Sequence, residues 1–591
     1  MNPGPRQVDD QLVNLGLIVL LGGAVVLGLL RLAGSIAAWL TRATRPQRGL
    51  DGARGVIATP TDPGAALGAH GLSPIAYWFV VAALFALIGA IAWSGWRALS
   101  TIRETSKRDV RRVDGVATRR DVTRVASESA LLKRAHNLRP SLPSPDAHDV
   151  GYLLGTARGR GVWTSVEDSV LVLGPPRSGK GLHLVVNAIL DAPGAVVTTA
   201  TRPDNITITL EARRKRGPVA IFDPQRLAEG LPSGLRWSPV RGCEDPLAAM
   251  IRATGLASAT GLSAGGVESG GFWEGKTRTA LQALLHAAAL DRRTPAELLS
   301  WTLAPSAAAD AVAILASHSD AATGWAESLD SMIESDPRTR DSIWMGVSLA
   351  LSALADPRVL EAVSPTDDEA FDPATFLEDN GTLYLLATGA GAGASWPLVA
   401  ALIEDLVETA RHLAARSSGA RLDPPVLLAL DEIGNLAPLP SLPTLMAEGG
   451  GTGITTMPVL QSLSQARDKW GDHAANAIWD AAIVKVILGG TASARDLQDL
   501  STLIGDRDER TDTITIGDHG SRGLQRSTRR VPILPPDTIR TLPFGTGLVL
   551  LRSIPPIVTD LRRWTDRPDG HELARLRATT EQLLGYPSTR S

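Results

Sequence analysis

The sequence predicts a membrane-anchored α/β protein with a parallel-dominated sheet and an inserted all-α domain. Three observations predict this fold class. Two long uncharged stretches lie near the N-terminus, and a short apolar run further on leads into a glycine-rich loop and a helical pattern. The lysine of that loop, Lys180, is 251 positions from an acidic pair that begins at Asp431. Because one βαβ unit needs only about 30 residues, a separation of this size indicates an insertion between core strands.

Composition limits the class of protein and the kinds of site. The chain has 591 residues, and at about 150 residues per domain this length suggests three or four units. With 44% hydrophobic and 20% charged residues, disordered, collagen-like and coiled-coil classes are excluded. The net charge is −3, so any nucleic-acid surface must be local. The single cysteine, Cys243, excludes a disulfide framework and a cysteine metal cluster, and the histidines show no metal-ligand spacing.

Two stretches have the length of membrane-spanning helices. Residues 12–30 and 71–96 contain no charged side chain, and about 20 apolar residues cross a bilayer core. We therefore predict transmembrane helices at about 12–30 and 75–96. A cleaved signal peptide is the alternative for the first stretch, but Asp9 and Asp10 do not suit its basic leading region.

A phosphate-binding loop follows a predicted strand. Residues 170–173 form an apolar run, residues 174–181 read Gly-Pro-Pro-Arg-Ser-Gly-Lys-Gly, and residues 182–190 have helical spacing. In such a loop the backbone N–H groups point at a triphosphate, and the helix N-terminus and the lysine add positive charge. We predict nucleotide binding by Gly174, Arg177, Ser178, Gly179, Lys180, Gly181 and Leu182.

The loop departs from the usual pattern at one position. Gly181 stands where a serine or threonine usually holds magnesium, and Leu182 offers no hydroxyl either. Other groups or water must then hold the metal, and weak ATP hydrolysis is one outcome that this loop allows.

A carboxylate pair and an amide follow two further predicted strands. Asp431 and Glu432 come directly after the apolar run 426–430, and Gln461 follows a predicted strand at 453–460. We predict that Asp431 binds magnesium, that Glu432 acts as general base and that Gln461 positions water near the γ-phosphate. The alternatives are carboxylates that cap a following turn and an ordinary polar residue at a strand end.

The nucleotide motif also decides the orientation in the membrane. Basic residues follow the second predicted span, but the loop between the spans contains five arginines, so the charge rule decides weakly. ATP is a cytosolic substrate, so we expect the N-terminus and the C-terminal ATPase domain to be cytoplasmic. The predicted domains begin with a membrane anchor at 1–100, which includes a non-cytoplasmic loop, and a basic stalk and linker at 101–150. The nucleotide-binding domain has two parts, 151–244 and 365–568, on either side of an all-α domain at 245–364. A C-terminal tail follows at 569–591.

These motifs together resemble one known family. The chain is similar to type IV coupling proteins, the membrane-anchored hexameric ATPases of conjugation and type IV secretion. The resemblance runs in order over nearly the whole chain, and many members likewise have glycine after the loop lysine. The matching segments are the phosphate loop at 174–181, 200–204, 221–224, 428–436, 449–454, 461–465, 470–471 and 535–543.

The resemblance implies a RecA-like P-loop NTPase core, ATP and magnesium as cofactors, and a homo-hexamer. It also implies an arginine supplied by a neighbouring subunit, for which Arg467 and Arg495 are candidates. The implied partners are single- or double-stranded DNA, a relaxase or other relaxosome protein, channel components and the membrane. The all-α domain corresponds to the part of the family proposed to contact DNA or the relaxosome.

We expect an ATPase of the inner or plasma membrane, multi-pass, that recruits a DNA or relaxase–DNA substrate and pumps it to a type IV secretion channel. One alternative is a coupling ATPase for protein effectors without DNA translocation. Another is a nucleotide-gated docking scaffold with little hydrolysis, which the residues at 181 and 182 keep open. A chromosome-segregation translocase would be expected to carry a winged-helix domain after the motor, and none is visible.

Overall fold

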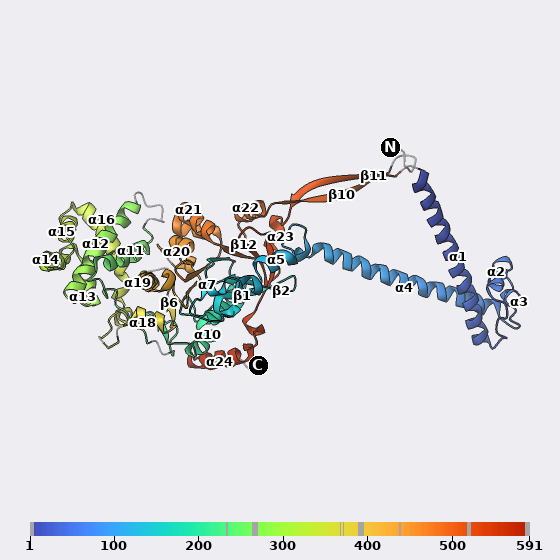
Figure 1. Ribbon diagram of the computed structural model, residues 1–591, viewed down its shortest axis with the longest axis horizontal. Helices are drawn as coiled ribbons and strands as arrows, with labels where there is room; N and C mark the ends of the chain where they lie inside the picture. Colours follow the sequence, from blue (N-terminus) through green and yellow to red (C-terminus); the bar gives the residue numbers. More distant parts are fainter. Residues whose placement is uncertain are drawn as a thin grey trace. The chain divides into compact units, whose positions relative to one another are not determined.

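The computed structural model describes residues 5–231, 234–262, 270–366, 368–369, 371–387, 395–436, 439–516 and 522–585. The chain forms two compact units, divided between Asp109 and Val110 (Figure 1). The first unit is helical. The second contains a large sheet with helices on both faces and a helical insert.

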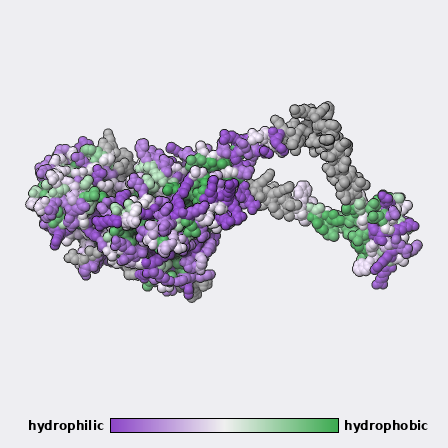
Figure 2. Space-filling view, viewed as in Figure 1, coloured by the Kyte–Doolittle hydropathy of each residue, from purple (hydrophilic) through white to green (hydrophobic). Residues whose placement is uncertain are grey.

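The first unit contains two long apolar helices. They are α1 (Pro5–Thr41) and α4 (Pro74–Arg108), and Gly22–Thr41 and Pro74–Arg97 are long and apolar enough to cross a membrane. The short helices α2 (Leu50–Ala58) and α3 (Pro63–Leu67) lie in the segment that joins them. In Figure 2 the described surface of α4 near these short helices is mostly hydrophobic.

Helix α1 continues well past the predicted span 12–30. The side chain of Arg31 does not end the helix, because its guanidinium group donates to Ser35 Oγ at 2.8 Å and to the Pro46 carbonyl at 2.7 Å. These acceptors satisfy the charge locally. The position of one arginine in the sequence therefore does not mark the end of this helix.

The sheet of the second unit is mostly parallel. In the described part of the chain its strand order is β2-β1-β13-β12-β9-β3-β8-β7-β4-β6-β5, parallel from β9 to β5 and antiparallel from β2 to β9. The strands are β1 (Gly151–Ala157), β2 (Arg160–Ser165), β3 (Val170–Leu173), β4 (Val196–Ala200), β5 (Val219–Phe222), β6 (Thr382–Leu386), β7 (Val426–Leu430), β8 (Ile454–Leu460), β9 (Val484–Leu488), β12 (Thr546–Leu551) and β13 (Ile557–Leu561).

Helices cover both faces of this sheet. Along β3, Val170 and Val172 pack into a core with the phosphate-loop helix α9 (Val186–Asp191), whereas Leu171 and Leu173 pack into a second core on the opposite face. This alternation is the period of two that a strand imposes, and burial on both faces explains why its sequence is continuously apolar. The second core includes side chains of α19 (Trp396–Arg416), α20 (Leu442–Glu448), α21 (Leu463–Ala481) and α22 (Ala494–Ile504).

The insert between β5 and β6 is helical, as the sequence predicts. Its α-helices are α11 (Pro246–Ser258), α12 (Gly270–Leu290), α13 (Pro295–Leu303), α14 (Ala309–Ser317), α15 (Trp325–Ile333), α16 (Pro337–Leu351), α17 (Pro357–Ala362) and α18 (Pro373–Glu378). Helix α11 packs along both α12 and α19, which joins the insert to the sheet. Trp301 and Trp344 are buried, and the Trp344 indole donates to the Trp301 carbonyl at 3.2 Å. These two rings therefore belong to the core of the insert.

Residues 110–150 fold against the sheet, which differs from the linker predicted within 101–150. The helices α5 (Arg119–Val125) and α6 (Glu128–Leu132) bury Val122 and Leu131 in the core beneath β1 and β2. Arg139 is buried and pairs with Asp423, whose other oxygen accepts from the Ser141 N–H at 2.8 Å. High charge and proline content thus did not identify a linker, because the charges have partners in the fold.

We expect Thr118→Ala to destabilise this segment. The Thr118 hydroxyl accepts from the Asp121 N–H, and the Asp121 carboxylate accepts from the Thr118 N–H, which together cap α5. Losing an N-cap side chain costs about 1 kcal/mol. Thermal unfolding of the detergent-solubilised chain measures this loss. Thr123→Ala is the matched control, because the Thr123 hydroxyl donates only to the Arg119 carbonyl one turn earlier; an equal loss in both variants would contradict the cap.

Two elements lie at the edges of the second unit. The antiparallel hairpin of β10 (Asp506–Ile516) and β11 (Arg522–Pro532) projects from the other elements of the unit in Figure 1. Helix α24 (Gly570–Leu583) packs along α10 (Asp204–Arg214), where Glu572 accepts from the Lys215 ammonium at 2.7 Å. The sequence predicts a C-terminal tail at 569–591 and gives no signal for the hairpin.

Candidate functional site

The phosphate loop runs from β3 into a tight helical turn. Two residues of the loop have left-handed backbone, Arg177 with φ 63° and Gly179 with φ 87°. A side chain at Gly179 would lie 2.8 Å from the His183 ring and 2.9 Å from the Phe544 ring, so only glycine fits there. Residues Gly181–Val185 then form a π-helical turn that leads into α9. Such turns are rare and occur often at functional sites.

Lys180 lies across the inside of the loop. Its ammonium group donates to the Gly174 carbonyl at 2.7 Å and to the Pro175 carbonyl at 2.9 Å. Burial lowers the pKa of Lys180, while the carboxylates of Asp431 and Glu432 raise it in part. The lysine and the two acids therefore interact electrostatically, although 251 positions separate Lys180 from Asp431.

Asp431 is held by three neighbouring groups at the end of β7. One carboxylate oxygen accepts from the Glu432 N–H at 3.0 Å, and the other accepts from the Asn205 side-chain amide at 3.1 Å. The Thr199 hydroxyl donates to the Asp431 carbonyl at 2.8 Å. Burial raises the pKa of Asp431 to about 6, and the neighbouring Glu432 charge adds to this, whereas Asn205 and Lys180 oppose it.

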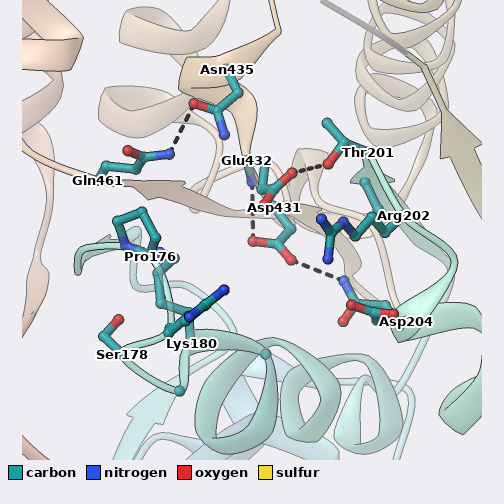
Figure 3. A pocket seen from close by; sticks show the side chains of 15 residues that line it. Pro176, Ser178, Lys180, Thr201, Arg202, Asp204, Asp431, Glu432, Asn435 and Gln461 are labelled. Carbon is teal, nitrogen blue, oxygen red and sulfur yellow. Dashed lines mark hydrogen bonds between the residues drawn. The ribbon is translucent and has the colours of Figure 1, made fainter.

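Glu432 has an unusual backbone and one hydroxyl partner. Its φ of 54° lies in the left-handed region, which non-glycine residues adopt rarely and which concentrates at functional sites. The Thr201 hydroxyl, directly after β4, donates to the Glu432 carboxylate. Figure 3 shows this pair beside Asp431, with Lys180 on the opposite side of the cavity.

Gln461 directly follows β8, the strand between β3 and β7. Its side-chain amide donates to Asn435 Oδ1 at 3.0 Å, and the Gln465 amide donates to the same oxygen at 2.8 Å. The Gln461 N–H in turn donates to Gln465 Oε1 at 2.8 Å. Two glutamines and one asparagine thus form a small network that fixes the Gln461 side chain beside the acidic pair.

One cavity of about 490 Å³ joins these groups. Of the predicted site residues, it is lined by Arg177, Ser178, Gly179, Lys180, Gly181, Asp431, Glu432 and Gln461. The other two predicted residues lie at the ends of the loop and outside this lining. The Gly174 N–H donates to the Leu460 carbonyl at 3.0 Å, and Leu182 packs against an apolar cluster with Val186 and Ile208.

The lining also contains residues that were not predicted as site residues. They are Pro176, Ala200, Thr201, Arg202, Asp204, Asn205 and Asn435. Several of these follow β4, and the segment 200–204 stood out only through the family resemblance. Polar residues after an apolar strand are the available signal, but the sequence does not show that β4 lies next to β7 in the sheet.

The two candidate trans-acting arginines differ in exposure. Arg467 donates to the buried carboxylate of Asp496 at 3.0 Å within the same chain. The Arg495 side chain is 78% exposed and lies 4.0 Å from Asp499. Of the two, Arg495 is therefore the more exposed, whereas Arg467 is held by a largely buried ion pair within its own fold.

For the nucleotide hydrolysis that the sequence predicts, we expect Thr201→Val to slow turnover about tenfold. The substitution keeps the shape but removes the donor to Glu432, and a hydrogen bond to a charged group contributes about 1.5–3 kcal/mol. Thr201→Ser retains the hydroxyl and is the matched control. Steady-state turnover, measured together with nucleotide affinity, tests this role: a loss of affinity without a change in rate would show that Thr201 does not act through Glu432.

Comparisons with known proteins agree on one relationship. A protein-family model described as "TraM recognition site of TraD and TraG" matches residues 425–544. Protein VirD4 of Agrobacterium fabrum is 25% identical over 413 residues, which cover 67% of this chain and 59% of that protein. Protein VirD4 of Rhizobium rhizogenes is 24% identical over 67% of this chain and 58% of that protein, so both matches span less than two thirds of the relative.

The fold also has a match among solved structures. The bacterial conjugative coupling protein TrwBdeltaN70 has a TM-score of 0.50 and 19% identity, over 74% of this chain and 91% of that one. The matched family segment contains Asp431, Glu432 and Gln461, and the order of sheet, helical insert and second half of the sheet follows the same fold. The chain is therefore similar in sequence and fold to conjugative coupling proteins, as its motifs indicate.

Proposed function

We propose that the chain is an ATP-dependent coupling protein that recruits a DNA or relaxase–DNA substrate and pumps it to a type IV secretion channel. The observation that carries the enzymatic part is the convergence of Lys180, Asp431, Glu432 and Gln461 in one cavity from the ends of three neighbouring strands. The coupling part is supported by the similarity to VirD4 and to the conjugative coupling protein TrwBdeltaN70.

The residues present fit a magnesium nucleotide. Ser178 Oγ is buried and has no hydrogen-bond partner among the described residues, so its hydroxyl is available to bind the nucleotide. Asp431 offers carboxylate oxygen, the ligand type that magnesium prefers. No group of three or more His, Cys, Asp or Glu that could hold a metal by itself is present in the described ranges, which suits an ion bound chiefly through phosphates and water. When bound, magnesium neutralises the charge of the phosphates.

In this proposal each side chain has one task. Gly174, Arg177, Ser178, Gly179, Gly181 and Leu182 belong to the loop and helix start that bind the phosphates, and Lys180 supplies the charge for the β and γ oxygens. Asp431 holds the metal. Glu432, placed by Thr201, accepts a proton from the attacking water, and Gln461, fixed by Asn435, orients that water.

Membrane anchoring and assembly are further parts of the proposal. The helices α1 and α4 support a two-pass anchor of the inner or plasma membrane, with the N-terminus and the second unit cytoplasmic. Relaxosome proteins, channel components and DNA are the proposed partners, and a homo-hexamer is the proposed assembly. The proposed domain limits are 1–100, 101–150, 151–244, 245–364, 365–568 and 569–591, with residues 110–150 folded against the sheet of the second unit.

ATP turnover by the full-length chain in detergent, with and without single- and double-stranded DNA, tests the function. We expect turnover that DNA stimulates and that Lys180→Ala abolishes. Turnover that no DNA stimulates but that effector proteins stimulate would favour a protein-coupling ATPase.

A nucleotide-gated scaffold is the second candidate, and one observation favours it. Gly181 lies at the cavity but has no hydroxyl, so the loop would offer a bound magnesium one ligand fewer than usual. Tight ATP binding by the full-length chain with no turnover under any condition would support this candidate and exclude the motor.

A further inference from the structure

The segment between α1 and α4 folds back along the two helices. We call residues 42–73 the cap. A side chain at Gly34 of α1 would lie 2.6 Å from Leu67 of the cap, and the Pro46 carbonyl accepts from Arg31 at 2.7 Å. The Tyr77 hydroxyl of α4 donates to the Leu30 carbonyl of α1 at 3.0 Å. The cap is therefore packed beside the ends of both apolar helices and does not extend away from them.

Aromatic and apolar side chains surround the cap at this end of the helices. Trp39 near the end of α1 is 78% exposed, and Trp78 near the start of α4 donates its indole N–H to the Pro60 carbonyl at 2.9 Å. Leu50 and Ile57 of α2 are 55% and 62% exposed, although Val56 of the same helix is buried. Tryptophans at the ends of spanning helices and outward apolar side chains on a short helix are typical of a membrane–water interface.

Four arginines of the cap have no partner among the described residues. The side chains of Arg42, Arg45, Arg48 and Arg54 are exposed, and no ion pair or hydrogen bond joins their guanidinium groups to another group within the described part of the chain. The two carboxylates of the cap are used differently. Asp62 is the N-terminal capping residue of helix α3 and accepts from the Ala65 N–H at 3.0 Å. Asp51 lies in the first turn of α2, where a negative charge interacts favourably with the helix dipole. The outward field of the cap is therefore positive.

We propose that the cap binds the phosphate headgroups of anionic phospholipids in the leaflet that it faces. The proposal rests on the membrane anchoring proposed above. Three independent features support it. The cap packs beside the ends of the two apolar helices, apolar side chains of α2 point outward, and four arginines have no partner in the described part of the chain. Guanidinium groups bind phosphate oxygens through two parallel hydrogen bonds, and basic residues near a bilayer attract anionic lipid. An arginine-rich segment is then held at the membrane by lipid and not by another chain.

Trp39 provides a local reporter for the lipid beside the cap. The full-length chain is reconstituted in phosphatidylcholine vesicles that contain the same fraction of either brominated phosphatidylglycerol or brominated phosphatidylcholine. The fluorescence of Trp39 is taken as the difference between the native chain and Trp39→Phe. We expect brominated phosphatidylglycerol to quench Trp39 several-fold more strongly than brominated phosphatidylcholine, and we expect high salt to reduce this ratio because salt screens exposed charges.

Charge variants separate the cap from the rest of the chain. Replacing Arg42, Arg45, Arg48 and Arg54 by Gln should lower the quenching ratio to about one, whereas replacing them by Lys should retain most of it, since lysine keeps the attraction to an anionic surface. Replacing the exposed Arg278, Arg292, Arg338 and Arg416 of the second unit by Gln removes the same charge and should leave the ratio unchanged. A ratio near one in the native chain, or an unchanged ratio in the cap Gln variant, would overturn the lipid site.

Flotation distinguishes failure of the lipid site from failure of the anchor. If the chain floats with pure phosphatidylcholine vesicles but shows no selectivity at Trp39, the anchor stands and the lipid site is overturned. If it does not float with any vesicle, membrane anchoring fails and the lipid site fails with it. Loss of selectivity when double-stranded DNA or an acidic protein is added would show that the arginines prefer another anion, which also contradicts the proposal.

Discussion

We expect the replacement of Glu432 by Gln to lower the rate of the proposed ATP hydrolysis by about 10³-fold and to leave ATP binding intact. A positioned general base contributes about 10²–10⁴-fold to a rate, and the glutamine amide cannot accept the proton of the attacking water. The substitution keeps the size of the side chain, and the amide oxygen can still accept from the Thr201 hydroxyl. Steady-state turnover and equilibrium binding of a fluorescent ATP analogue, both on the full-length chain in detergent, measure the two expectations separately.

Glu448→Gln is the matched control for this substitution. Glu448 is exposed at the end of α20 and does not line the cavity, so its replacement should leave both rate and affinity unchanged. A Glu432→Gln chain that keeps turnover within tenfold of the native rate would remove Glu432 from the role of base. Loss of ATP affinity in the same variant would instead assign Glu432 to ligand binding.

The main strands of the site could be predicted because each carries a strong local signal. The apolar runs at 170–173 and 426–430 match β3 and β7, and the run at 453–460 matches β8 within one residue. These strands are buried on both faces, so their side chains are continuously apolar, and the predicted site residues follow at their carboxyl ends. In a parallel sheet these ends meet at one edge. The order of apolar run and polar residue along the chain therefore indicates that such residues can meet in one site.

The parts that the sequence did not predict depend on pairing or on long-range partners. Thr201 and Asn205 reach the acidic pair only because β4 lies next to β7, and no local pattern encodes that order. The hairpin of β10 and β11 has a first strand rich in Asp, Glu and Arg, which is typical of a loop. Residues 110–150 resemble a charged linker because the partners of their charges, such as Asp423 for Arg139, lie almost 300 positions away.

Asp431→Asn should abolish hydrolysis and at the same time stabilise the ligand-free chain at alkaline pH. Burial raises the pKa of Asp431 to about 6, above its ordinary value of 3.8, so the folded state disfavours the ionised form. Two pKa units correspond to about 3 kcal/mol. Because the residue is only partly buried, we expect a gain of about 2 kcal/mol in the free energy of unfolding. The Asn205 amide can turn so that its oxygen accepts from the new amide.

The pH dependence identifies the cause of this gain. A carboxyl group with a raised pKa in the folded state favours folding below pH 4, and this advantage is lost as the pH rises through about 6. The variant should therefore gain most at pH 8, about half as much at pH 5, and almost nothing near pH 4.

Thermal unfolding without nucleotide or divalent cation measures the gain at each pH. Asp468→Asn, at an exposed residue of α21, is the control and should change stability by less than about 0.5 kcal/mol at every pH. A gain in stability that does not depend on pH, or a loss of stability at pH 8, would contradict the conclusion that burial disfavours the ionised form of Asp431. A gain that follows the expected pH course in a chain without turnover would show that Asp431 is kept ionised for its ligand at the expense of stability, as expected for a metal-binding residue in a site of this kind.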